Sequence, residues 1–377
     1  MILLIHNRYR TTGGEERVVE DLQWLVREHL GRSVAVLERD SARLGRARAA
    51  AGLLRGGLDP REVADAVERT GARIVHAHNL LPGLGWRALA AAREAGARVV
   101  LHLHNYRLVC AVGTCVDPAG HDCTRCHGRR TAAGVRLNCR GSRAEAAVYG
   151  AGLALWQRRT VELADAIVVP SEAALRRLRE LGAPVDRRPV HVVGHVVRAF
   201  AERSTAAEGR YALVVSRLAP EKGVEVAIDA CRAIGMPLVV CGAGPLEEEL
   251  RRRAAGADVT FAGRVDDAEL ARLRAGAAVA LAPSRAAETF GLAALEAMAA
   301  GVPVVAARVG ALADLEGAVE LVPPGDPEAT AAAVRRVVAD REAGTRALEA
   351  ARRRAAPEVV APRLEAVYAA VLNDERR

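Results

Sequence analysis

The chain of 377 residues has little lysine, few aromatic side chains and no long apolar run. Aromatic residues make up 3% of it, which leaves almost nothing for nucleobases to stack on and argues against a nucleic-acid-binding protein. No apolar run approaches the roughly 18 to 20 residues of a membrane span, and the apolar start meets His6-Asn7-Arg8 too early for a secretory signal peptide. We therefore expect a soluble, cytoplasmic protein.

Positive charge is unevenly placed along the chain. The net charge is +8, and residues 1–200 carry 31 basic against 20 acidic residues, whereas the remainder carries 23 basic against 26 acidic. Scattered, solvated arginines account for this, since no run of five or more basic residues occurs. The basic first half leaves three alternatives open, which are nucleic acid, peripheral contact with the inner membrane face and an acidic acceptor.

Length and apolar content favour two α/β domains. A chain of this length, with 51% apolar residues, has enough apolar side chains for two hydrophobic cores. Short apolar runs alternate with helical patterns throughout, as in doubly wound parallel sheets. Strands are predicted at 1–6, 33–38, 74–78, 98–103, 166–169 and 190–193, and then at 211–215, 237–241, 259–262, 277–282, 302–306 and 319–322.

Two acids lie near one predicted junction in the second half. The apolar run 277–282 ends at Pro283, and a helix is expected to open near Phe290. Glu288 then lies on the loop, and Glu296 lies about two turns inside the helix. Either acid can be a plain solvated charge, but two carboxylates at one strand end also suit the hydroxyls of a sugar and a ribose.

The chain's one lysine, Lys222, stands in the motif Ser216-Arg217-Leu-Ala-Pro-Glu-Lys222-Gly after the predicted strand 211–215. A chain that uses arginine everywhere else keeps lysine where a compact ammonium is needed, and phosphate oxygens are the natural partner. Glycines follow two other strands. Gly242 and Gly244 open a helix, and Gly13-Gly14 lie between the first strand and helix, either as a phosphate cradle or as a plain tight turn.

Histidine pairs end two consecutive strands, as His76-Ala-His78-Asn79 and His102-Leu-His104-Asn105. The carboxyl ends of parallel strands line the ligand crevice, and each pair shares one face of its strand. Metal ligation is one interpretation, and a hydrogen-bonding or core role is the favoured one.

Together, the Arg-x4-Lys-Gly segment, Gly242-Ala-Gly244-Pro and the Glu-x7-Glu stretch resemble the donor domain of family 4 retaining glycosyltransferases (group 1), over nearly the whole chain. The resemblance implies the GT-B fold, an α/β fold of two doubly wound Rossmann-like domains facing across a cleft. It further identifies the chain with the subgroup that carries a cysteine-rich insert in the N-terminal domain.

The resemblance also implies roles for individual residues. Arg217 and Lys222 hold the donor diphosphate, Glu288 binds the transferred sugar, and His104 is the family's donor-site histidine, with Asn105 where an Asp is often found. His78 and Asn79 become candidates for acceptor contacts. The residues expected to bind the nucleotide sugar are Gly13, Gly14, Gly242, Gly244, Arg264, Val265, Thr289, Phe290, Gly291, Leu292 and Glu296.

Five of the seven cysteines lie between Cys110 and Cys139, in the predicted insert 105–140. A disulfide is disfavoured in the cytoplasm, the usual spacings of an iron–sulfur cluster are absent, and free thiols remain an alternative. A structural Zn²⁺ fits better, because a loop rich in Gly, Asp and Arg has little apolar surface to fold it. Related sequences with this insert suggest the ligands Cys110, Cys123, Cys126 and Cys139, with Cys115 spare; Cys231 and Cys241 are expected in the core.

The expected organisation is an acceptor-side domain at 1–194, a linker at 195–209, a donor domain at 210–358 and a C-terminal helix at 359–377 that crosses back to the first domain. The predicted activity is transfer of a hexose-type sugar from a UDP- or GDP-sugar to an unidentified acceptor, such as a glycolipid, a polysaccharide precursor or a natural product. No Asp-x-Asp motif is present, so no catalytic divalent metal is expected. The alternatives are a nucleotide-sugar epimerase of the same fold and a zinc-containing nucleic-acid-binding protein.

Overall fold

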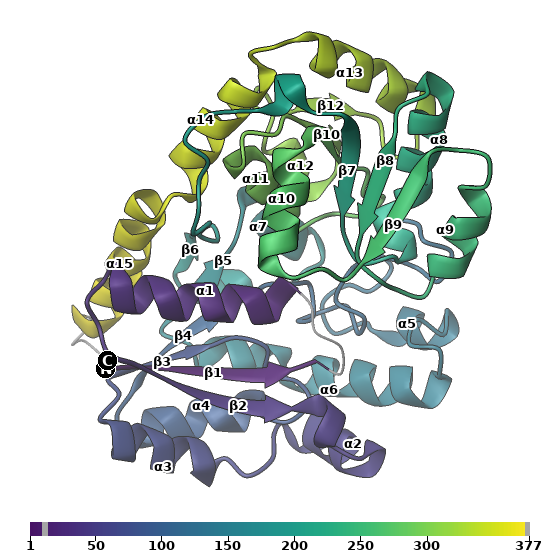
Figure 1. The fold of residues 1–377 in the computed structure, drawn as a ribbon. Coiled ribbons are helices and arrows are strands. Elements are labelled where there is room, and N and C mark those ends of the chain that lie inside the picture. The colour runs from purple at the N-terminus through teal and green to yellow at the C-terminus, as the bar shows by residue number, and fades with distance from the viewer. Residues whose placement is uncertain (10–13, 374–377) are drawn as a thin grey trace. The chain divides into compact units, whose positions relative to one another are not determined.

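The computed structural model describes residues 1–9 and 14–373, which form two compact units. The first unit comprises residues 1–118, 123–196 and the stretch from 357 onwards; the second comprises residues 119–122 and 197–356 (Figure 1). Within the described chain, each unit is built on one sheet of six strands, all of them parallel. The predicted fold class, GT-B with two doubly wound Rossmann-like domains, is therefore confirmed at the level of the two sheets.

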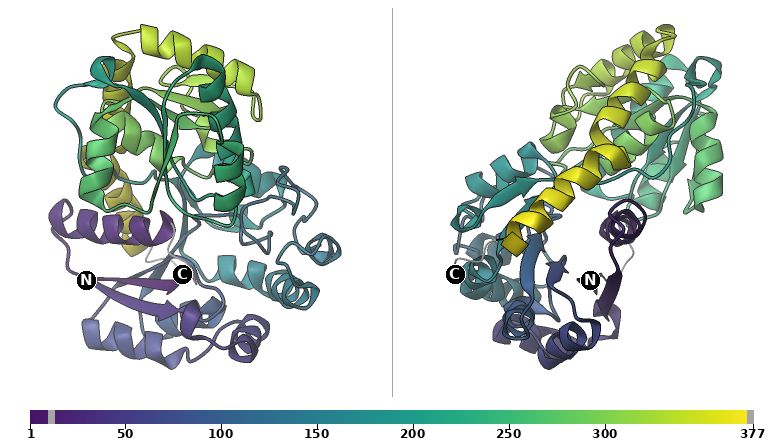
Figure 2. Two further views of the ribbon diagram at one scale, coloured as in Figure 1. Left: turned by 45° about the vertical axis from the view of Figure 1, so that its right-hand side comes forward. Right: turned by 90° about the vertical axis from the view of Figure 1, so that its left-hand side faces the viewer.

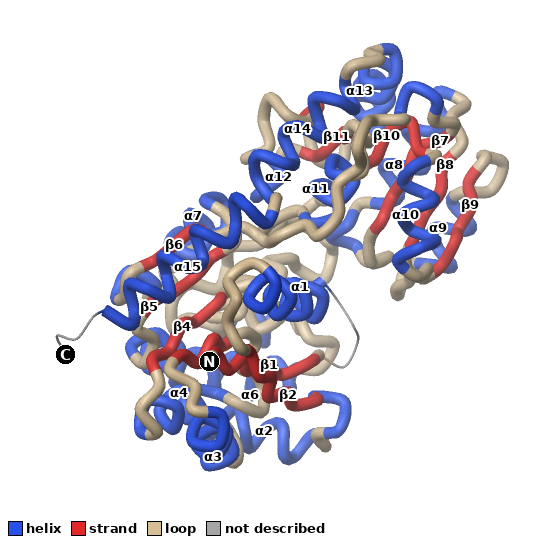
Figure 3. The backbone as a smooth tube through the Cα atoms, turned by 60° about the vertical axis from the view of Figure 1, so that its left-hand side comes forward, coloured by secondary structure: helices blue, strands red, loops and turns tan. Residues whose placement is uncertain are grey.

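The first sheet has the strand order β2-β1-β3-β4-β5-β6. Helices α3 and α4 lie on one face and α1 and α15 on the other (Figure 3). Its strands are β1 (Ile2–Arg8), β2 (Val34–Asp40), β3 (Ile74–Ala77), β4 (Arg98–His102), β5 (Ala166–Val169) and β6 (Val190–Val192). Its helices are α1 (Gly14–Glu28), α2 (Arg46–Arg55), α3 (Arg61–Thr70), α4 (Gly85–Glu94), α5 (Ala132–Arg136), α6 (Arg143–Glu162), α7 (Glu172–Glu180) and α15 (Pro357–Asn373).

The C-terminal helix α15 completes the core of the first unit. Val360, Leu364 and Tyr368 of this helix are buried in one cluster with Ile2 and Leu4 of β1. Both Met1 and α15 thus belong to the same unit (Figure 2). The helix begins two residues before the expected position 359, because its first residue is a proline, which is tolerated in the first turn of a helix.

Helix α2 lies in a stretch that showed no clear pattern in the sequence. Its run of arginine and alanine gives a weak apolar periodicity, yet Ala49, Gly52 and Leu53 form a buried stripe at helical spacing. The helix ends at Gly56 in the left-handed conformation, where a Cβ atom would overlap the indole of Trp86.

The second sheet has the strand order β12-β11-β10-β7-β8-β9. Its strands are β7 (Tyr211–Val215), β8 (Leu238–Cys241), β9 (Val259–Gly263), β10 (Ala277–Ala282), β11 (Val304–Ala307) and β12 (Glu320–Val322). Its helices are α8 (Val224–Ile234), α9 (Glu247–Arg253), α10 (Asp267–Ala275), α11 (Leu292–Ala299), α12 (Gly310–Ala313), α13 (Pro327–Ala339) and α14 (Ala343–Ala355), preceded by the 3₁₀ turns η3 (Ala206–Glu208) and η4 (Pro220–Lys222).

Alternate residues of the second sheet's strands face two separate cores. Leu213 and Ala280 pack with α11 and α14 on one face, whereas Val214, Val240 and Leu281 pack with α8 and α13 on the other. Strands buried on both faces read as continuous apolar runs, which explains why their positions were predictable. Among the described residues, no helix has the length and apolar character to cross a bilayer.

Candidate functional site

The second sheet has its topological switch point between β7 and β10, which are adjacent strands with crossovers leaving in opposite directions. In open α/β sheets, ligands bind outside the carboxyl ends of the strands at this point. The loop after β7 carries Lys222, and the loop after β10 carries Glu288. The sheet order thus brings together two residues 66 positions apart in the sequence.

Lys222 and Glu288 form an ion pair at the switch point. Lys222 Nζ donates to Glu288 Oε1 at 2.5 Å, and Ser284 Oγ donates to the same oxygen at 2.6 Å. The two charged side chains are 26% and 22% exposed, so the pair is partly shielded yet within reach of a ligand. Burial alone would raise the pKa of Glu288, but Lys222, Ser284 and Arg217 hold it below its ordinary value, and the carboxylate is ionised at neutral pH.

Glycines hold the loops on either side of this pair. Gly223 ends η4 with φ +62°, and a Cβ atom there would overlap the carbonyl oxygen of Pro283. The amide of Arg285 donates to the carbonyl of Glu221 at 2.8 Å, which ties the same two loops together. A side chain at position 223 would therefore separate the loops that bring Lys222 to Glu288.

The predicted nucleotide loop Gly242-Ala-Gly244 packs directly on the segment after β7. Gly242 has φ +134°, and a Cβ atom at either glycine would overlap backbone atoms of Ser216 or Leu218. The amide of Leu218 donates to the carbonyl of Ala243 at 3.1 Å. These glycines are required for the close approach of two backbone segments, and this requirement holds whether or not a nucleotide also contacts them.

Arg217 lies beside the pair on the same loop and forms an ion pair with Glu221, its guanidinium 54% exposed. Thr289 to Gly291 are half-buried in the loop that leads from Glu288 to α11. That helix begins at Leu292 rather than near Phe290, because Gly291 takes the left-handed conformation at φ +80°. The expected start was two residues early, and Glu296 lies in the second turn of the helix rather than about two turns inside it.

Glu296 has a partner that the sequence did not suggest. Arg274 of α10 donates to Glu296 Oε2 at 2.5 Å, and the two side chains are 13% and 19% exposed. Arg264 and Val265 follow β9 at the same sheet edge, with Arg264 exposed and Val265 half-buried. The predicted residues of the second unit thus all follow the carboxyl ends of β7, β8, β9 and β10.

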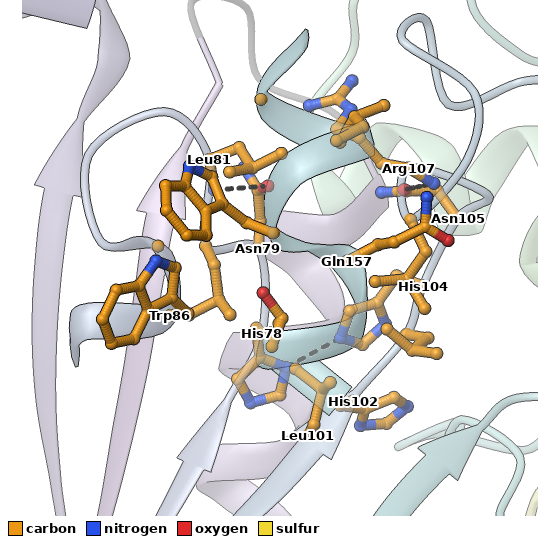
Figure 4. A pocket seen from close by; sticks show the side chains of 18 of the residues that line it. His78, Asn79, Leu81, Trp86, Leu101, His102, His104, Asn105, Arg107 and Gln157 are labelled. Atoms are coloured by element: carbon orange, nitrogen blue, oxygen red, sulfur yellow. Dashed lines mark hydrogen bonds between the residues drawn. The ribbon is translucent and has the colours of Figure 1, made fainter. Parts of the chain in front are cut away.

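In the first unit, the predicted histidines gather with others into one buried cluster. His6, His76, His78, His102, His104 and His195 are each at most 9% exposed. His78 Nδ1 and His104 Nε2 share a hydrogen bond of 2.7 Å (Figure 4). Burial lowers the pKa of His76 and His195 to about 3, and burial together with the neighbouring imidazoles holds those of His78, His102 and His104 well below the ordinary value, so the rings are neutral.

Neutral imidazoles can either donate hydrogen bonds or bind a metal ion. Within the described part of the chain, His78, His102 and His104 each offer a ring nitrogen within 4.8 Å of the others. The hydrogen bond between His78 and His104 already occupies one nitrogen of each ring. This arrangement agrees with the hydrogen-bonding role favoured from the sequence.

Gly14 is the first residue of α1, and Gly13 lies outside the described residues. Next to Gly14, Glu15 accepts from the hydroxyl of Tyr9 at 2.6 Å and from Asn105 Nδ2 at 3.0 Å. Burial raises the pKa of Glu15.

The side chain of Asn79 donates to the carbonyl of Asn7 and accepts from the amide of Leu81, so it holds the loop after β3 as well as reaching the site.

A pocket of about 650 Å³, part of it open to solvent, lies at the ends of β3 and β4 in the first unit (Figure 4). Its polar lining includes Glu15, His78, His104, Asn105 and Arg107. The apolar lining includes Leu53, Leu81, Leu101, Leu108, Leu153, Trp86 and Trp156. Sequence reasoning missed Glu15, Arg107 and both tryptophans as lining residues. The tryptophans reach the strand ends only through the packing of α4 and α6, whereas Glu15 lies at the start of α1 and Arg107 in the loop after β4.

The cysteines of the insert line a second, smaller cavity. Cys110, Cys115, Cys123, Cys126 and Cys139 all face it, so Cys115 belongs to the cluster as well. A hydrogen bond from Cys115 lowers the pKa of Cys110 to about 6, which gives the cluster one thiolate near neutral pH. A set of thiols with a Cys-x2-Cys pair is chemically suited to zinc. Among the described residues, however, no cysteines form a group of three ligand atoms as close as the histidine group, and zinc remains a prediction. Cys231 and Cys241 are buried in the second unit's cores, as expected.

Comparison with known proteins agrees with this arrangement. The family model for glycosyl transferases group 1 matches residues 198–354, and that for the glycosyl transferase 4-like domain matches residues 10–195. A GDP-mannose-dependent alpha-(1-6)-phosphatidylinositol dimannoside mannosyltransferase of Mycobacterium tuberculosis is 42% identical over 37% of this chain and 38% of its own length. The sulfoquinovosyl transferase of Arabidopsis thaliana is 32% identical over 48% of this chain and 39% of its own length. The chain thus spans less than two-fifths of these curated relatives.

Solved structures match over the whole chain. The Anabaena protein HepE in complex with UDP has a TM-score of 0.65 at 18% identity, covering 98% of this chain and 100% of its own. Sucrose-phosphate synthase from Thermosynechococcus elongatus has a TM-score of 0.68 at 18% identity, covering 99% of both chains. Identity this low shows the fold alone, whereas the two family models together match residues 10–195 and 198–354. The chain therefore belongs to the group 1 glycosyltransferases of family 4.

Proposed function

We propose that this glycosyltransferase moves a sugar from a nucleoside diphosphate sugar to an acceptor with retention of configuration at the sugar. The single observation that carries the proposal is the contact between Lys222 and Glu288 at the switch point of the second sheet. It sets a compact cation, suited to phosphate, beside a carboxylate that can accept hydrogen bonds from sugar hydroxyls. A nucleoside diphosphate sugar carries both groups in one molecule.

The main contribution of this site to the reaction is electrostatic stabilisation. Lys222 and Arg217 bind the diphosphate and neutralise the charge that develops on it as the bond between the anomeric carbon and the phosphate oxygen breaks. Glu288 binds a hydroxyl of the departing sugar ring, and its low pKa keeps it a hydrogen-bond acceptor throughout. The acceptor oxygen forms the new bond to the anomeric carbon, and its proton passes to the leaving phosphate.

Glu296 is proposed to bind the nucleotide ribose. Arg274 holds its carboxylate on the face of α11 by one oxygen, which leaves the other oxygen for the two ribose hydroxyls. Gly242 and Gly244, with the segments at Arg264 and 289–292, would form the remaining nucleotide site, since all of them follow strand ends of the same sheet. Gly13 and Gly14 are proposed to place backbone amides near the donor phosphate.

His104 is proposed to contact the transferred sugar. Its ring is neutral, and the hydrogen bond to His78 fixes the orientation of both imidazoles. A neutral ring can donate to a sugar hydroxyl without adding a positive charge that would compete with Lys222 for the diphosphate. The hydrogen bond makes His78 a positioning residue for His104.

The relatives support this choice of donor. One curated relative is named GDP-mannose-dependent, and one structural neighbour is a complex with UDP. A UDP- or GDP-sugar is therefore the proposed donor. For the cysteine insert, we propose a structural Zn²⁺ held by Cys110, Cys123, Cys126 and Cys139, whose thiolates would fold a loop with little apolar surface.

Incubation with a panel of UDP- and GDP-sugars tests the proposal. We expect one donor to raise the unfolding temperature and to be hydrolysed slowly in the absence of acceptor, with nuclear magnetic resonance showing the released sugar first in the configuration of the donor. Conversion of the donor into an epimer would instead identify an epimerase. Failure of every donor to bind would contradict the proposal.

A further inference from the structure

The pocket of the first unit has an apolar part and a polar part. Leucines and tryptophans from α2, α4 and α6 form the apolar part, and side chains after β3 and β4 form the polar part. Figure 4 shows Trp86 on one side of the pocket and His104, Asn105 and Arg107 on the other. A pocket so divided suits an amphipathic ligand better than a free sugar, which is polar over its whole surface.

Several polar atoms that line the pocket are buried without a hydrogen-bond partner in the described structure. These atoms are Glu15 Oε1, His78 Nε2, both ring nitrogens of His102, Trp86 Nε1 and Arg107 Nε. Buried polar atoms are nearly always hydrogen-bonded, so several such atoms around one cavity indicate a ligand that brings hydroxyl groups. The polar end therefore fits a sugar or polyol headgroup.

The two tryptophans are held in place for contact with an apolar group. Their ring centroids lie 5.6 Å apart, and the indole of Trp156 donates to the carbonyl of Leu54 at 3.0 Å. The guanidinium of Arg159 lies over the ring of Trp86, 5.1 Å from its centroid. The rings are thus fixed by contacts outside the pocket, which lowers the entropy cost of binding a ligand.

The surface beside the pocket is apolar and basic. Leu54 and Leu155, each next in sequence to a lining residue, are 44% and 49% exposed. Helix α2 also carries exposed Arg46, Arg48 and Arg55, and no acidic residue. Exposed leucines among arginines are typical of a surface that rests on an anionic bilayer.

We infer that the pocket binds the headgroup and the first part of the hydrocarbon chain of a lipid-linked acceptor, presented at an anionic membrane surface. The inference rests on the proposed function, since it names the class of acceptor for the same reaction. The headgroup hydroxyls meet the unpartnered atoms of the polar part, and the hydrocarbon lies against Trp86, Trp156 and Leu81. Leu54 and Leu155 enter the bilayer from which the lipid comes.

Tryptophan fluorescence tests the pocket directly. Two of the chain's three tryptophans line the pocket, and the third, Trp24, lies on α1 beside His29. In a Trp24→Phe background, titration with methyl, hexyl and octyl glucoside below their micelle concentrations should show affinity that rises about threefold for each methylene added. Equal affinity for the methyl and octyl compounds would overturn the inference in favour of a water-soluble acceptor.

Variants distinguish glucoside binding in the pocket from nonspecific binding to other apolar surface. Trp156→Ala and Leu81→Ser, on different elements, should each weaken octyl glucoside about tenfold and methyl glucoside much less. Val338→Ser is the matched control, because Val338 is an equally exposed apolar residue (42%) on α13, outside the pocket. A loss in the control as large as in the pocket variants would overturn the inference.

Sedimentation with vesicles tests the membrane surface. We expect the protein to bind phosphatidylcholine vesicles that contain phosphatidylglycerol, and the double variant Leu54→Ser/Leu155→Ser to lose most of that binding while Val338→Ser keeps it. Unchanged vesicle binding by the double variant would overturn the assignment of Leu54 and Leu155 to a membrane-binding surface. Glucoside binding is measured without nucleotide, so a protein that binds octyl glucoside but no nucleotide sugar contradicts the proposed function, whereas one that binds only the nucleotide sugar contradicts this inference.

Discussion

Lys222, the only lysine of the chain, donates to Glu288 at 2.5 Å from the neighbouring strand end of the second sheet. Each residue determines the state of the other, because the ammonium keeps the carboxylate ionised and the carboxylate orients the ammonium. This contact connects the phosphate site to the sugar site.

The first prediction concerns the pKa of Glu288. The Ser284→Ala variant loses a hydrogen bond to the ionised carboxylate, so the pKa of Glu288 should rise. A depressed carboxyl pKa stabilises the fold above the unfolded-state pKa, and this stabilisation is lost as pH falls through the folded-state value. The unfolding temperature of wild type relative to Glu288→Gln should thus fall only below about pH 4.5, the ordinary carboxyl pKa. That of Ser284→Ala, relative to the same protein with Glu288→Gln, should begin to fall at the same pH but should fall by less and level off at a higher pH. Coincident pH profiles for the two proteins would contradict the assignment.

The second prediction compares two glycines in the left-handed conformation. Gly235 has φ +67° and open space around a would-be Cβ atom, so Gly235→Ala should cost only the conformational strain, about 1 to 2 kcal/mol of unfolding free energy. Gly223 has φ +62° and would also overlap Pro283, so Gly223→Ala should cost more and should weaken donor binding as Lys222 moves. Urea unfolding and donor titration measure both effects. Similar stability and full donor affinity in both variants would show that the loop contact is unimportant.

The third prediction separates the two acids. Glu296→Ala should weaken binding of the bare nucleoside diphosphate, whereas Glu288→Ala should leave that affinity nearly intact and reduce discrimination between donor sugars. Arg274→Ala should also weaken binding of the bare nucleoside diphosphate, but less than Glu296→Ala does, because it removes only the partner that positions the carboxylate. Arg336→Ala, which breaks an exposed ion pair with Glu320 in the same unit, serves as the control. Calorimetry with bare nucleotide that shows equal losses for Glu288→Ala and Glu296→Ala would refute the division.

The fourth prediction concerns the cysteine insert. Elemental analysis of protein purified without metal-affinity resin should give about one zinc per chain, and Cys126→Ser should lose the metal and acceptor turnover but keep donor binding. Cys231→Ala, at a core cysteine of the second unit, should retain the zinc. Metal-free protein with full transferase activity would favour free thiols instead.

Sequence reasoning located the strands well and the side-chain partners poorly. The strands at 166–169, 211–215 and 277–282 were predicted with the bounds that the structure shows, because strands buried on both faces are continuous apolar runs. Helix α2 was missed, since its short alanine-rich stripe gives little periodicity. The start of α11 was placed two residues early, because nothing in the sequence distinguishes a left-handed Gly291 from a helical one.

Partners that lie far apart in the sequence depend on topology. The pairing of Arg274 with Glu296 follows from the packing of α10 and α11 beside one sheet edge, and no local pattern encodes it. Likewise, Trp86 and Trp156 meet only because α4 and α6 are neighbours. Motif spacing identified Lys222 and Glu288 as candidates, and only the strand order shows that they touch.

The most direct test of the account is donor binding and transfer by Lys222 variants. Lys222→Ala should weaken nucleoside diphosphate binding and abolish most transfer, at a cost of about 2 to 4 kcal/mol in transition-state stabilisation. Lys222→Arg should also be impaired, because a planar fork does not replace a point charge between a diphosphate and Glu288. Measured against wild type with the preferred UDP- or GDP-sugar, this account predicts loss of transfer in both variants, and wild-type activity in Lys222→Arg would contradict it.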